Sequence, residues 1–370
     1  MTHSLEPAIG PGRRYRDRLY TLSIIVTGRC NAACTYCHYY LSHDRKSYSY
    51  DISDELFETY LSFINLWKQE VGGILSYRFS GGDPAVLGDR LFELANIADR
   101  KTGIRPFVLT AGKKMDAEWV SKARASALSH VTVSIENPVR PDKGAPNPFK
   151  VVRSIARFDS VALPIIPGVC VVPNDCFKHL YEICRWFYEE LGAIPSIAEA
   201  NYGAYCSPTE QEWQELGDNL SRVIGDFLRK TPLSLFGSVA PELTFGGRDA
   251  YICDLDLENS YRMTSENVPS KVSQVLKRLT ETNYPQLGCA SSTCPWWESC
   301  ENTKWYWQGD AKNPRDVKVS DYCRLKRLLS DAFVRCTVDA KYPKTTSTFY
   351  EGASSNKLQL KRIPVVSVRS

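Results

Sequence analysis

The sequence predicts an α/β fold built on a parallel sheet, and two observations support this prediction. Between residues 18 and 235, short apolar runs alternate about six times with amphipathic stretches. The apolar runs are rich in β-branched residues, which is typical of buried strands. Strands that alternate with helices form a parallel sheet with right-handed crossovers. Six such units fit an open doubly wound sheet or a partial barrel, and spacing alone does not decide between them.

The elements follow one another in a regular order. Strands are expected at 22–26, 76–79, 107–109, 131–135, within 163–172 and at 194–199. Helices are expected at 53–71, through 91–98, and at 118–129, 151–158, 175–191 and 209–230. In the first helix, Leu56, Tyr60, Ile64 and Trp67 recur at helical spacing, and Ser53 fits the N-cap. Ligands of such sheets bind where strands end, so the loops after the strands are the first place to search for a site.

Composition places the chain among soluble globular proteins. It has 370 residues, 43% hydrophobic and 24% charged, with a net charge of +4. No apolar run approaches the roughly 20 residues that span a bilayer, and the basic residues 1–18 do not resemble a secretory signal. We therefore expect a cytoplasmic protein with no nucleic-acid or membrane partner. In a reducing compartment its 13 cysteines favour metal binding or catalysis over disulfides.

Changes in composition along the chain predict four segments. Residues 1–18 form an N-terminal extension, and residues 19–235 form the α/β domain. Residues 236–340 are rich in Gly, Asp, Asn, Ser and Trp and contain a second group of cysteines, which predicts a smaller domain. Residues 341–370 form a polar, basic tail.

The first group of cysteines directly follows the first expected strand. Cys30, Cys34 and Cys37 are spaced so that three thiolates can bind three irons of a [4Fe–4S] cluster and leave the fourth iron open for a ligand. Zinc is the main alternative, but a structural zinc site usually has four protein ligands. His38 is adjacent to Cys37, which makes it an awkward fourth ligand.

This loop resembles the signature of radical S-adenosylmethionine (SAM) enzymes, Cys-x3-Cys-x-aromatic-Cys, with Tyr36 at the aromatic position. The resemblance implies a partial (β/α)6 barrel over about residues 20–205. It also implies a [4Fe–4S] cluster at Cys30, Cys34 and Cys37, and SAM bound with its adenine near Tyr36. The implied reaction is reductive cleavage of SAM to a 5′-deoxyadenosyl radical that removes hydrogen from a substrate. A reductant such as flavodoxin or ferredoxin is then required.

Further residues extend the resemblance to a SAM pocket. The turn Gly81, Gly82, Asp83 and Pro84 is similar to the family's Gly-Gly-Glu-Pro turn, whose backbone holds the amino group of the SAM methionine. Thr110-Ala-Gly112 is similar to the family's Thr-Asn-Gly turn, with Ala in place of Asn. Polar contacts to SAM are implied at Ser134, Glu136 and Asn174.

The second group of cysteines predicts a second metal centre. Cys289, Cys294, Cys300 and Cys323 suit a closed [4Fe–4S] cluster or zinc equally well. Their arrangement resembles the C-terminal SPASM region of peptide-modifying radical SAM enzymes, which implies one auxiliary [4Fe–4S] cluster. A second auxiliary cluster is not expected, because Lys304 occupies the position of a further cysteine. Cys253 and Cys336 are then expected to be ordinary buried thiols, with a role as cluster ligand as the alternative for Cys253.

The same resemblance implies a substrate class. Enzymes with this layout mostly modify ribosomally made precursor peptides, and we expect carbon–carbon crosslinking of side chains, with a leader-binding partner protein if the chain itself does not bind the leader. The alternatives are a peptide epimerase or a sulfatase-type maturase, a small-molecule dehydrogenase, and a non-enzymatic metal scaffold. Cys170 and Cys206 are candidate hydrogen donors but more typical of structural thiols. The sequence identifies no catalytic acid or base.

Overall fold

The fold rests on one long sheet. The computed structural model describes residues 20–37, 49–70, 74–199, 208–227, 242–245, 251–253, 260–262, 324–325, 328–329 and 331–332. Within these residues, eight strands are hydrogen bonded in the order β10-β9-β8-β1-β2-β3-β4-β5. Their bounds are β1 Tyr20–Thr27, β2 Ile74–Gly81, β3 Phe107–Thr110, β4 Val131–Val133, β5 Ile165–Pro167, β8 Glu242–Phe245, β9 Tyr251–Cys253 and β10 Ser260–Arg262. Strands β8, β1, β2, β3, β4 and β5 pair in parallel, and β9 and β10 continue the sheet antiparallel.

The fifth expected strand is divided in two. Strand β5 pairs with β4, whereas β6 (Val169–Val172) pairs in parallel with β7 (Ser196–Glu199). Gly168 lies between them and donates its N–H to the carbonyl of Val133 at 2.8 Å. A Cβ atom at this position would lie 2.2 Å from Cγ2 of Thr132, so the backbone can approach β4 only as glycine. The chain thus bends between β5 and β6 without leaving the barrel wall.

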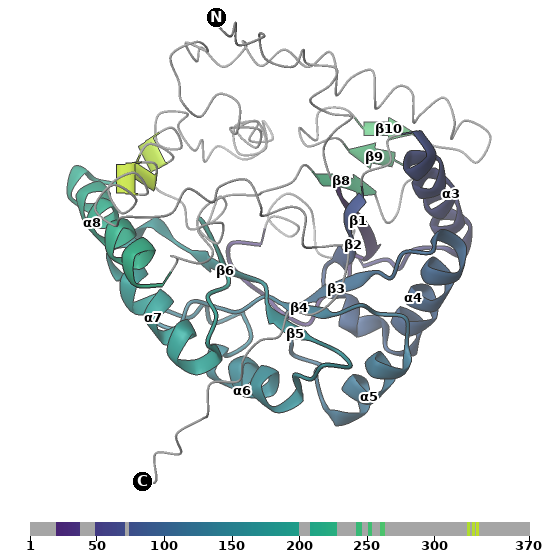
Figure 1. Cartoon of the computed structure of the whole chain (residues 1–370), viewed down its shortest axis with the longest axis horizontal. Coiled ribbons are helices and arrows are strands. Elements are labelled where there is room, and N and C mark those ends of the chain that lie inside the picture. The colour runs from purple at the N-terminus through teal and green to yellow at the C-terminus, as the bar shows by residue number, and fades with distance from the viewer. Residues whose placement is uncertain are drawn as a thin grey trace, which may run out of the picture.

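Helices cover the outer side of this wall (Figure 1). They are α3 Asp54–Glu70, α4 Asp89–Thr102, α5 Ala117–Ala125, α6 Pro148–Phe158, α7 Leu180–Leu191 and α8 Glu210–Asp226, with short 3-10 turns η1 Pro84–Leu87 and η2 Asn174–His179. Local sequence explains where they begin. The hydroxyl of Ser53 accepts a hydrogen bond from the Leu56 N–H before α3, and Thr209 with Glu212 forms a capping box before α8.

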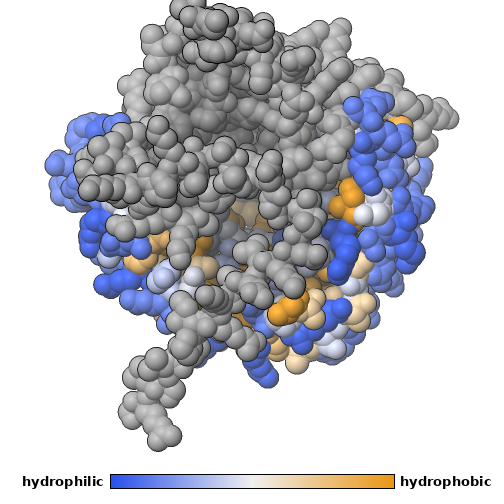
Figure 2. Space-filling view, viewed as in Figure 1, coloured by the Kyte–Doolittle hydropathy of each residue, from blue (hydrophilic) through white to orange (hydrophobic). Residues whose placement is uncertain are grey.

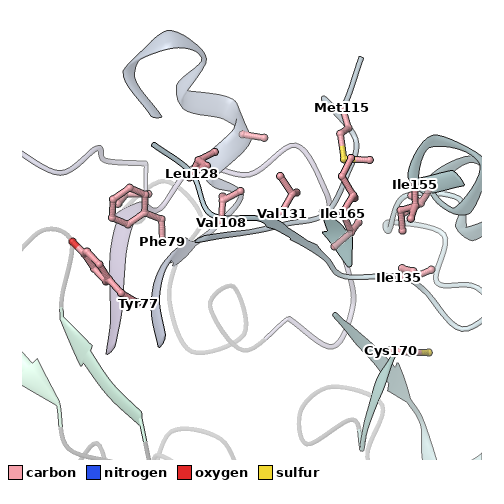
Figure 3. Close-up of a cluster of buried hydrophobic side chains, with 14 of the residues drawn as sticks. Tyr77, Phe79, Val108, Met115, Leu128, Val131, Ile135, Ile155, Ile165 and Cys170 are labelled. Carbon is pink, nitrogen blue, oxygen red and sulfur yellow. The ribbon is translucent and has the colours of Figure 1, made fainter. Parts of the chain in front are cut away.

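The core lies between the sheet and the helices. Tyr77 and Phe79 project from the same face of β2, and the Phe79 ring packs edge-on against Phe57 of α3 at 5.9 Å between centroids. Side chains of β3, β4 and β5 continue this layer (Figure 3). Hydrophilic residues dominate the outer rim over the helices (Figure 2). No helix in the described part of the chain is both long and apolar enough to cross a bilayer.

The architecture confirms the α/β fold class and the partial barrel implied by the resemblance. Boundaries differ in four helices. The one expected at 118–129 ends at Ala125, and the one expected at 175–191 begins with the 3-10 turn η2. The one expected at 151–158 begins at Pro148, and the one expected at 209–230 ends at Asp226. Strand β8 lies beyond residue 235 but pairs in parallel with β1. The division into segments at 18, 235 and 340 stays a prediction.

Candidate active site

The loop with the first three cysteines leaves the sheet at the end of β1. Its base is closed by two backbone hydrogen bonds, from Gly28 N–H to the Tyr50 carbonyl at 2.8 Å and from Ile52 N–H to the Val26 carbonyl at 3.0 Å. The chain on both sides of this loop is therefore held together at Gly28 and Tyr50. A loop closed at its base loses less entropy when its tip binds a ligand.

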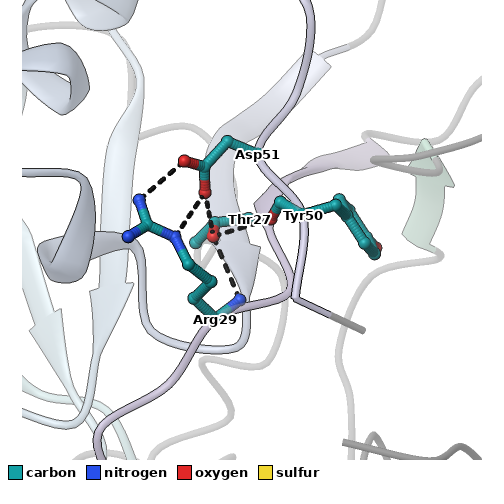
Figure 4. Close-up of polar contacts among 4 residues, drawn as sticks. All are labelled: Thr27, Arg29, Tyr50 and Asp51. Atoms are coloured by element: carbon teal, nitrogen blue, oxygen red, sulfur yellow. Dashed lines mark hydrogen bonds and ion pairs between the residues drawn. The ribbon is translucent and has the colours of Figure 1, made fainter. Parts of the chain in front are cut away.

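Side chains strengthen this base (Figure 4). The Arg29 guanidinium donates from Nε and Nη2 to the two oxygens of Asp51, at 2.8 and 2.6 Å. The buried Thr27 hydroxyl lies 2.7 Å from Asp51 Oδ1 and 3.0 Å from the Tyr50 carbonyl. It also accepts the Arg29 N–H at 3.1 Å. The bidentate pair and the hydroxyl orient the residue that directly precedes Cys30.

The Gly-Gly-Asp turn at the end of β2 lies directly against this loop. Gly82 N–H donates to the Thr27 carbonyl and Asp83 N–H donates to the Arg29 carbonyl, each at 2.8 Å. Gly81 has φ of +129°, and a Cβ at Gly82 would lie 2.2 Å from the Arg29 carbonyl oxygen. Both glycines are thus required for the close approach of the two loops.

Asp83 is a buried carboxylate with one unsatisfied oxygen. Its side chain accepts at Oδ1 from the Thr110 hydroxyl at 2.7 Å and from Ala85 N–H at 3.2 Å. Oδ2 is buried and has no hydrogen-bond partner among the described residues. Burial raises the pKa of Asp83, and these hydrogen bonds oppose that rise. An orphaned buried acceptor beside the cysteine loop fits a cationic amino group such as that of SAM.

Tyr36 and Glu136 connect the cysteine loop to the end of β4. The Tyr36 hydroxyl donates to Glu136 Oε2 at 2.5 Å, and the other carboxylate oxygen, Oε1, accepts the Asn137 N–H at 2.9 Å. Glu136 is only 4% exposed. Burial raises its pKa, while the bond from Tyr36 opposes the rise. Two residues implied as SAM contacts, 100 positions apart, are thus joined directly.

The three cysteine side chains supply a donor set that suits a [4Fe–4S] cluster. All three are partly buried, and Ala32 N–H donates to the sulfur of Cys30 at 3.3 Å. Burial, reinforced by neighbouring Cys37 and Glu136, raises the pKa of Cys34 to about 12. Iron must therefore displace the proton from this thiol. In the described part of the chain no three His, Cys, Asp or Glu side chains are placed to hold one ion, whereas a [4Fe–4S] cluster takes each thiolate on a different iron.

The connection between β4 and α6 also contacts the cysteine loop. Ala33 N–H donates to the Gly144 carbonyl at 2.7 Å, and Thr35 N–H donates to Asp142 Oδ2 at 3.0 Å. The Thr35 hydroxyl contacts the same Asp142 oxygen. Partial burial raises the pKa of Asp142, but hydrogen bonds led by the one from Thr35 outweigh it, so the pKa lies below its ordinary value.

Other expected site residues have different outcomes. Ser134 is half-buried at the same sheet edge, where its N–H donates to the Thr110 carbonyl at 2.8 Å. Asn174 begins η2, but its side chain lies outside the described residues, as do Cys206 and all four cysteines of the second group. The side chain of Cys170 is 0% exposed in the core, which favours a structural thiol over a hydrogen donor. Its assignment as donor has no support here.

Five residues of this site were not singled out from the sequence: Arg29, Asp51, Lys113, Asp142 and Gly144. Lys113 follows the turn after β3, and its Nζ donates to the Asn31 carbonyl at 2.8 Å. Of these five, only Arg29 could have been noticed in the sequence, because it directly precedes Cys30. The others become visible only when the ends of β1, β2, β3 and β4 meet at one edge.

Comparison with known proteins decides the family. A model described as the radical SAM superfamily matches residues 24–186. A probable GTP 3′,8-cyclase of Pyrobaculum aerophilum is 30% identical over 223 residues, which cover 57% of this chain and 67% of that protein. The chain belongs to the radical SAM superfamily.

Two further similarities extend beyond the family domain. A cysteine-type anaerobic sulfatase-maturating enzyme of Clostridium perfringens is 24% identical over 356 residues, covering 83% of this radical SAM chain and 94% of the relative. The solved structure of native anSMEcpe with bound AdoMet aligns with a TM-score of 0.61 at 19% identity, covering 87% and 99% of the two chains. The latter likeness supports the fold.

Family membership confirms the resemblance drawn from the cysteine loop. The predicted [4Fe–4S] cluster and SAM are the cofactors of radical SAM proteins, and an auxiliary [4Fe–4S] cluster is characteristic of enzymes like the sulfatase-maturating relative. The chain is therefore a radical SAM enzyme, and a purely structural metal scaffold is not supported. The ligand residues of each cluster stay predictions.

Proposed function

We propose that this radical SAM enzyme modifies a side chain of a polypeptide substrate, and that its product is a carbon–carbon crosslink within a ribosomally made precursor peptide. The alignment with the sulfatase-maturating relative carries the choice of substrate class, because it covers 94% of that protein and so extends past the SAM-binding barrel. The relative's name supports maturation of a sulfatase as the second candidate product.

The described residues divide the work of the proposed site. Cys30, Cys34 and Cys37 would bind three irons of the cluster and leave the fourth for SAM. Asp83 would accept the amino group of SAM at Oδ2, which otherwise stays buried without a partner. Tyr36 and Glu136, joined by their hydrogen bond, would line the pocket near the adenine of SAM. When bound, SAM and the reduced cluster supply the radical that removes hydrogen from the substrate.

The first experiment tests the cofactors and their ligands. The enzyme is reconstituted anaerobically with iron and sulfide, reduced with dithionite and given SAM, and the Cys30/Cys34/Cys37→Ala variant is treated in the same way. We expect about eight irons per chain in the wild type and about four in the variant, one cluster fewer. Deoxyadenosine should form only in the wild type. Equal iron in both proteins would contradict the ligand assignment.

The second experiment tests the substrate. Peptides encoded beside the gene, and a peptide with a sulfatase cysteine motif, are incubated with the reconstituted enzyme and analysed by mass spectrometry. A crosslink lowers the peptide mass by two hydrogen atoms, and no backbone fragments appear from cleavage between the two linked side chains. Oxidation of a single side chain also lowers the mass, but fragments from every backbone position are still seen. If neither peptide is altered and neither stimulates SAM cleavage, the polypeptide substrate is wrong.

A small-molecule substrate is the alternative from another class. The 30% identity to the probable GTP 3′,8-cyclase favours it, but that match covers 57% of this chain, against 83% for the sulfatase-maturating relative. Nucleoside triphosphates and sugar alcohols in the same deoxyadenosine assay discriminate the two classes. Stimulation by one of these compounds, with none by peptides, would replace the polypeptide proposal.

A further inference from the structure

Beyond Glu136, the connection between β4 and α6 has no role in the proposed chemistry, yet its residues 142–144 contact the cysteine loop. One of the three residues between Cys30 and Cys34, Ala33, and one of the two between Cys34 and Cys37, Thr35, make these contacts. Ala33 and Thr35 flank Cys34, and both donate their backbone N–H to this connection. The middle cysteine of the three is thus held from both sides.

The Asp142 carboxylate contacts both Thr35 of the cysteine loop and Gly144 of its own turn. Oδ2 accepts the Thr35 N–H at 3.0 Å and contacts the Thr35 hydroxyl, while Oδ1 accepts the Gly144 N–H at 2.7 Å. The Gly144 carbonyl in turn accepts from Ala33 at 2.7 Å. The carboxylate therefore orients its own turn and the cysteine loop at the same time. Hydrogen bonds to an ionised acceptor are about twice as strong as neutral ones.

Gly144 adds a steric requirement to this contact. A Cβ atom at position 144 would lie 2.0 Å from the Ala33 carbonyl oxygen and 2.4 Å from its carbonyl carbon. The obstacle is backbone, so a side chain there would push the cysteine loop away from the turn. The close backbone contact and the shared carboxylate together join the cysteine loop specifically to the turn at Asp142, which lies 107 residues from Thr35 in the sequence.

We propose that Asp142, whose carboxylate accepts the Gly144 N–H, is a positioning residue that holds Cys34 in the geometry the iron–sulfur cluster requires. Asp142 binds no iron in this account; it acts through Thr35 and Ala33. The same connection carries Glu136, which bonds to Tyr36. The turn after β4 thus positions both the cysteine loop, through Asp142, and one wall of the proposed SAM pocket, through Glu136. The proposal rests on the assignment of the cluster to Cys30, Cys34 and Cys37.

The experiment measures the cluster itself. Reconstituted wild type, Asp142→Ala, Asp142→Asn, Thr35→Val, Thr35→Ser and Gly144→Ala are compared for the rate at which a chelator bleaches the cluster, and for the EPR spectrum of the reduced protein with and without SAM. Asp218→Asn and Gly225→Ala on α8 are the matched controls, since Asp218 is exposed and a Cβ at Gly225 meets nothing within 4 Å.

We expect a graded result. Asp142→Ala and Gly144→Ala should lose the cluster about tenfold faster and show a weakened response of the EPR spectrum to SAM. Asp142→Ala removes the shared acceptor, and the Cβ of Gly144→Ala pushes the cysteine loop away from the turn. Thr35→Val should lose it about threefold faster, and Thr35→Ser, which keeps the hydroxyl, should behave as wild type. Asp142→Asn should also raise the cluster's reduction potential, since it removes a nearby negative charge. The double variant Thr35→Val/Asp142→Ala should be no worse than Asp142→Ala alone.

The outcomes separate the two proposals. If the Cys30/Cys34/Cys37→Ala variant keeps the SAM-responsive EPR signal, the cluster assignment has failed. If that signal is lost in the cysteine variant but Asp142→Ala and Thr35→Val bleach at the wild-type rate, the positioning role of Asp142 is overturned. Additive effects of Thr35→Val and Asp142→Ala would overturn it as well. Should Asp142→Ala fail to fold, Thr35→Val against Thr35→Ser decides alone.

Discussion

The hydroxyl of Tyr36 donates a 2.5 Å hydrogen bond to the carboxylate of Glu136, and thereby joins the cysteine loop to the end of β4. Both groups are largely buried, so the bond is shielded from water. In such a buried site a carboxylate without a hydrogen-bond partner would be costly. The pair forms a fixed wall at the place where family resemblance puts the adenine of SAM.

Removing this hydrogen bond should weaken SAM binding. In Tyr36→Phe the ring remains but Glu136 loses its donor, and an unsatisfied buried acceptor costs about 1–3 kcal/mol. We expect the Kd for SAM to rise about tenfold with the iron content unchanged. Equilibrium dialysis on the reconstituted enzyme measures this, with Tyr188→Phe on α7 as control because Tyr188 is 43% exposed. An unchanged Kd would remove Tyr36 from the SAM pocket.

Two substitutions of Asp83 should distinguish its contribution to SAM binding from its contribution to the free energy of unfolding. Asp83→Asn keeps an oxygen for Thr110 and Ala85 but replaces the orphaned Oδ2 with a donor that cannot accept an amino group. We expect Asp83→Asn to fold and to bind SAM at least about tenfold more weakly. Asp83→Ala should in addition lower the free energy of unfolding by about 1–2 kcal/mol, because the N-cap of η1 is lost. Equal SAM affinity in wild type and Asp83→Asn would show that Oδ2 does not face the ligand.

The base of the cysteine loop should depend more on its buried hydroxyl than on its exposed ion pair. Arg29 and Asp51 side chains are each 43% exposed, so their pairing contributes at most about 1 kcal/mol. Thr27 is 0% exposed and orders three neighbours. We expect Thr27→Val to lower the free energy of unfolding in urea by about 1–2 kcal/mol and Arg29→Met by less than half of that. The reverse order would show that the ion pair holds the loop.

His130 should make stability depend on pH. Burial lowers its pKa to about 4 from an ordinary value near 6.5. The folded protein thus keeps the neutral ring while the unfolded chain takes up a proton below pH 6.5, so this contribution to stability is present above 6.5 and lost as the pH falls toward 4. Between pH 7.5 and 5.5 the wild type should lose about 1 kcal/mol more than His130→Phe. The variant keeps the ring stack on Phe107, seen at 4.5 Å. Parallel pH profiles from anaerobic urea unfolding would contradict this.

Periodicity and local motifs predicted most of the barrel, because each strand and helix is encoded by residues that are neighbours in the sequence. The apolar face of α3, from Leu56 to Trp67, is an example. The cysteine loop and the Gly-Gly-Asp turn were equally visible, since each is one short segment. The division of the fifth strand was missed, although Pro167 and Gly168 are the residues at which strands usually bend.

The supports of the site could not be predicted in this way. Asp142 and Thr35 are 107 residues apart, and Asp51 and Arg29 are 22 apart. A lone aspartate in a loop resembles any other surface aspartate until the strands align their ends. Such contacts depend on tertiary structure, which no periodicity records.

The parallel pairing of β8 with β1 has a consequence for any attempt to divide the protein. Strand β1 carries the cysteine loop, and its backbone is hydrogen bonded on both sides, to β2 and to β8. A truncated chain that stops at residue 235 would lack β8 and leave β1 as a bare edge strand, with unpaired N–H and carbonyl groups next to the most sensitive part of the molecule. Bare edges recruit other strands and promote aggregation. A minimal SAM-cleaving fragment should therefore extend past Phe245, even though the family match ends at residue 186.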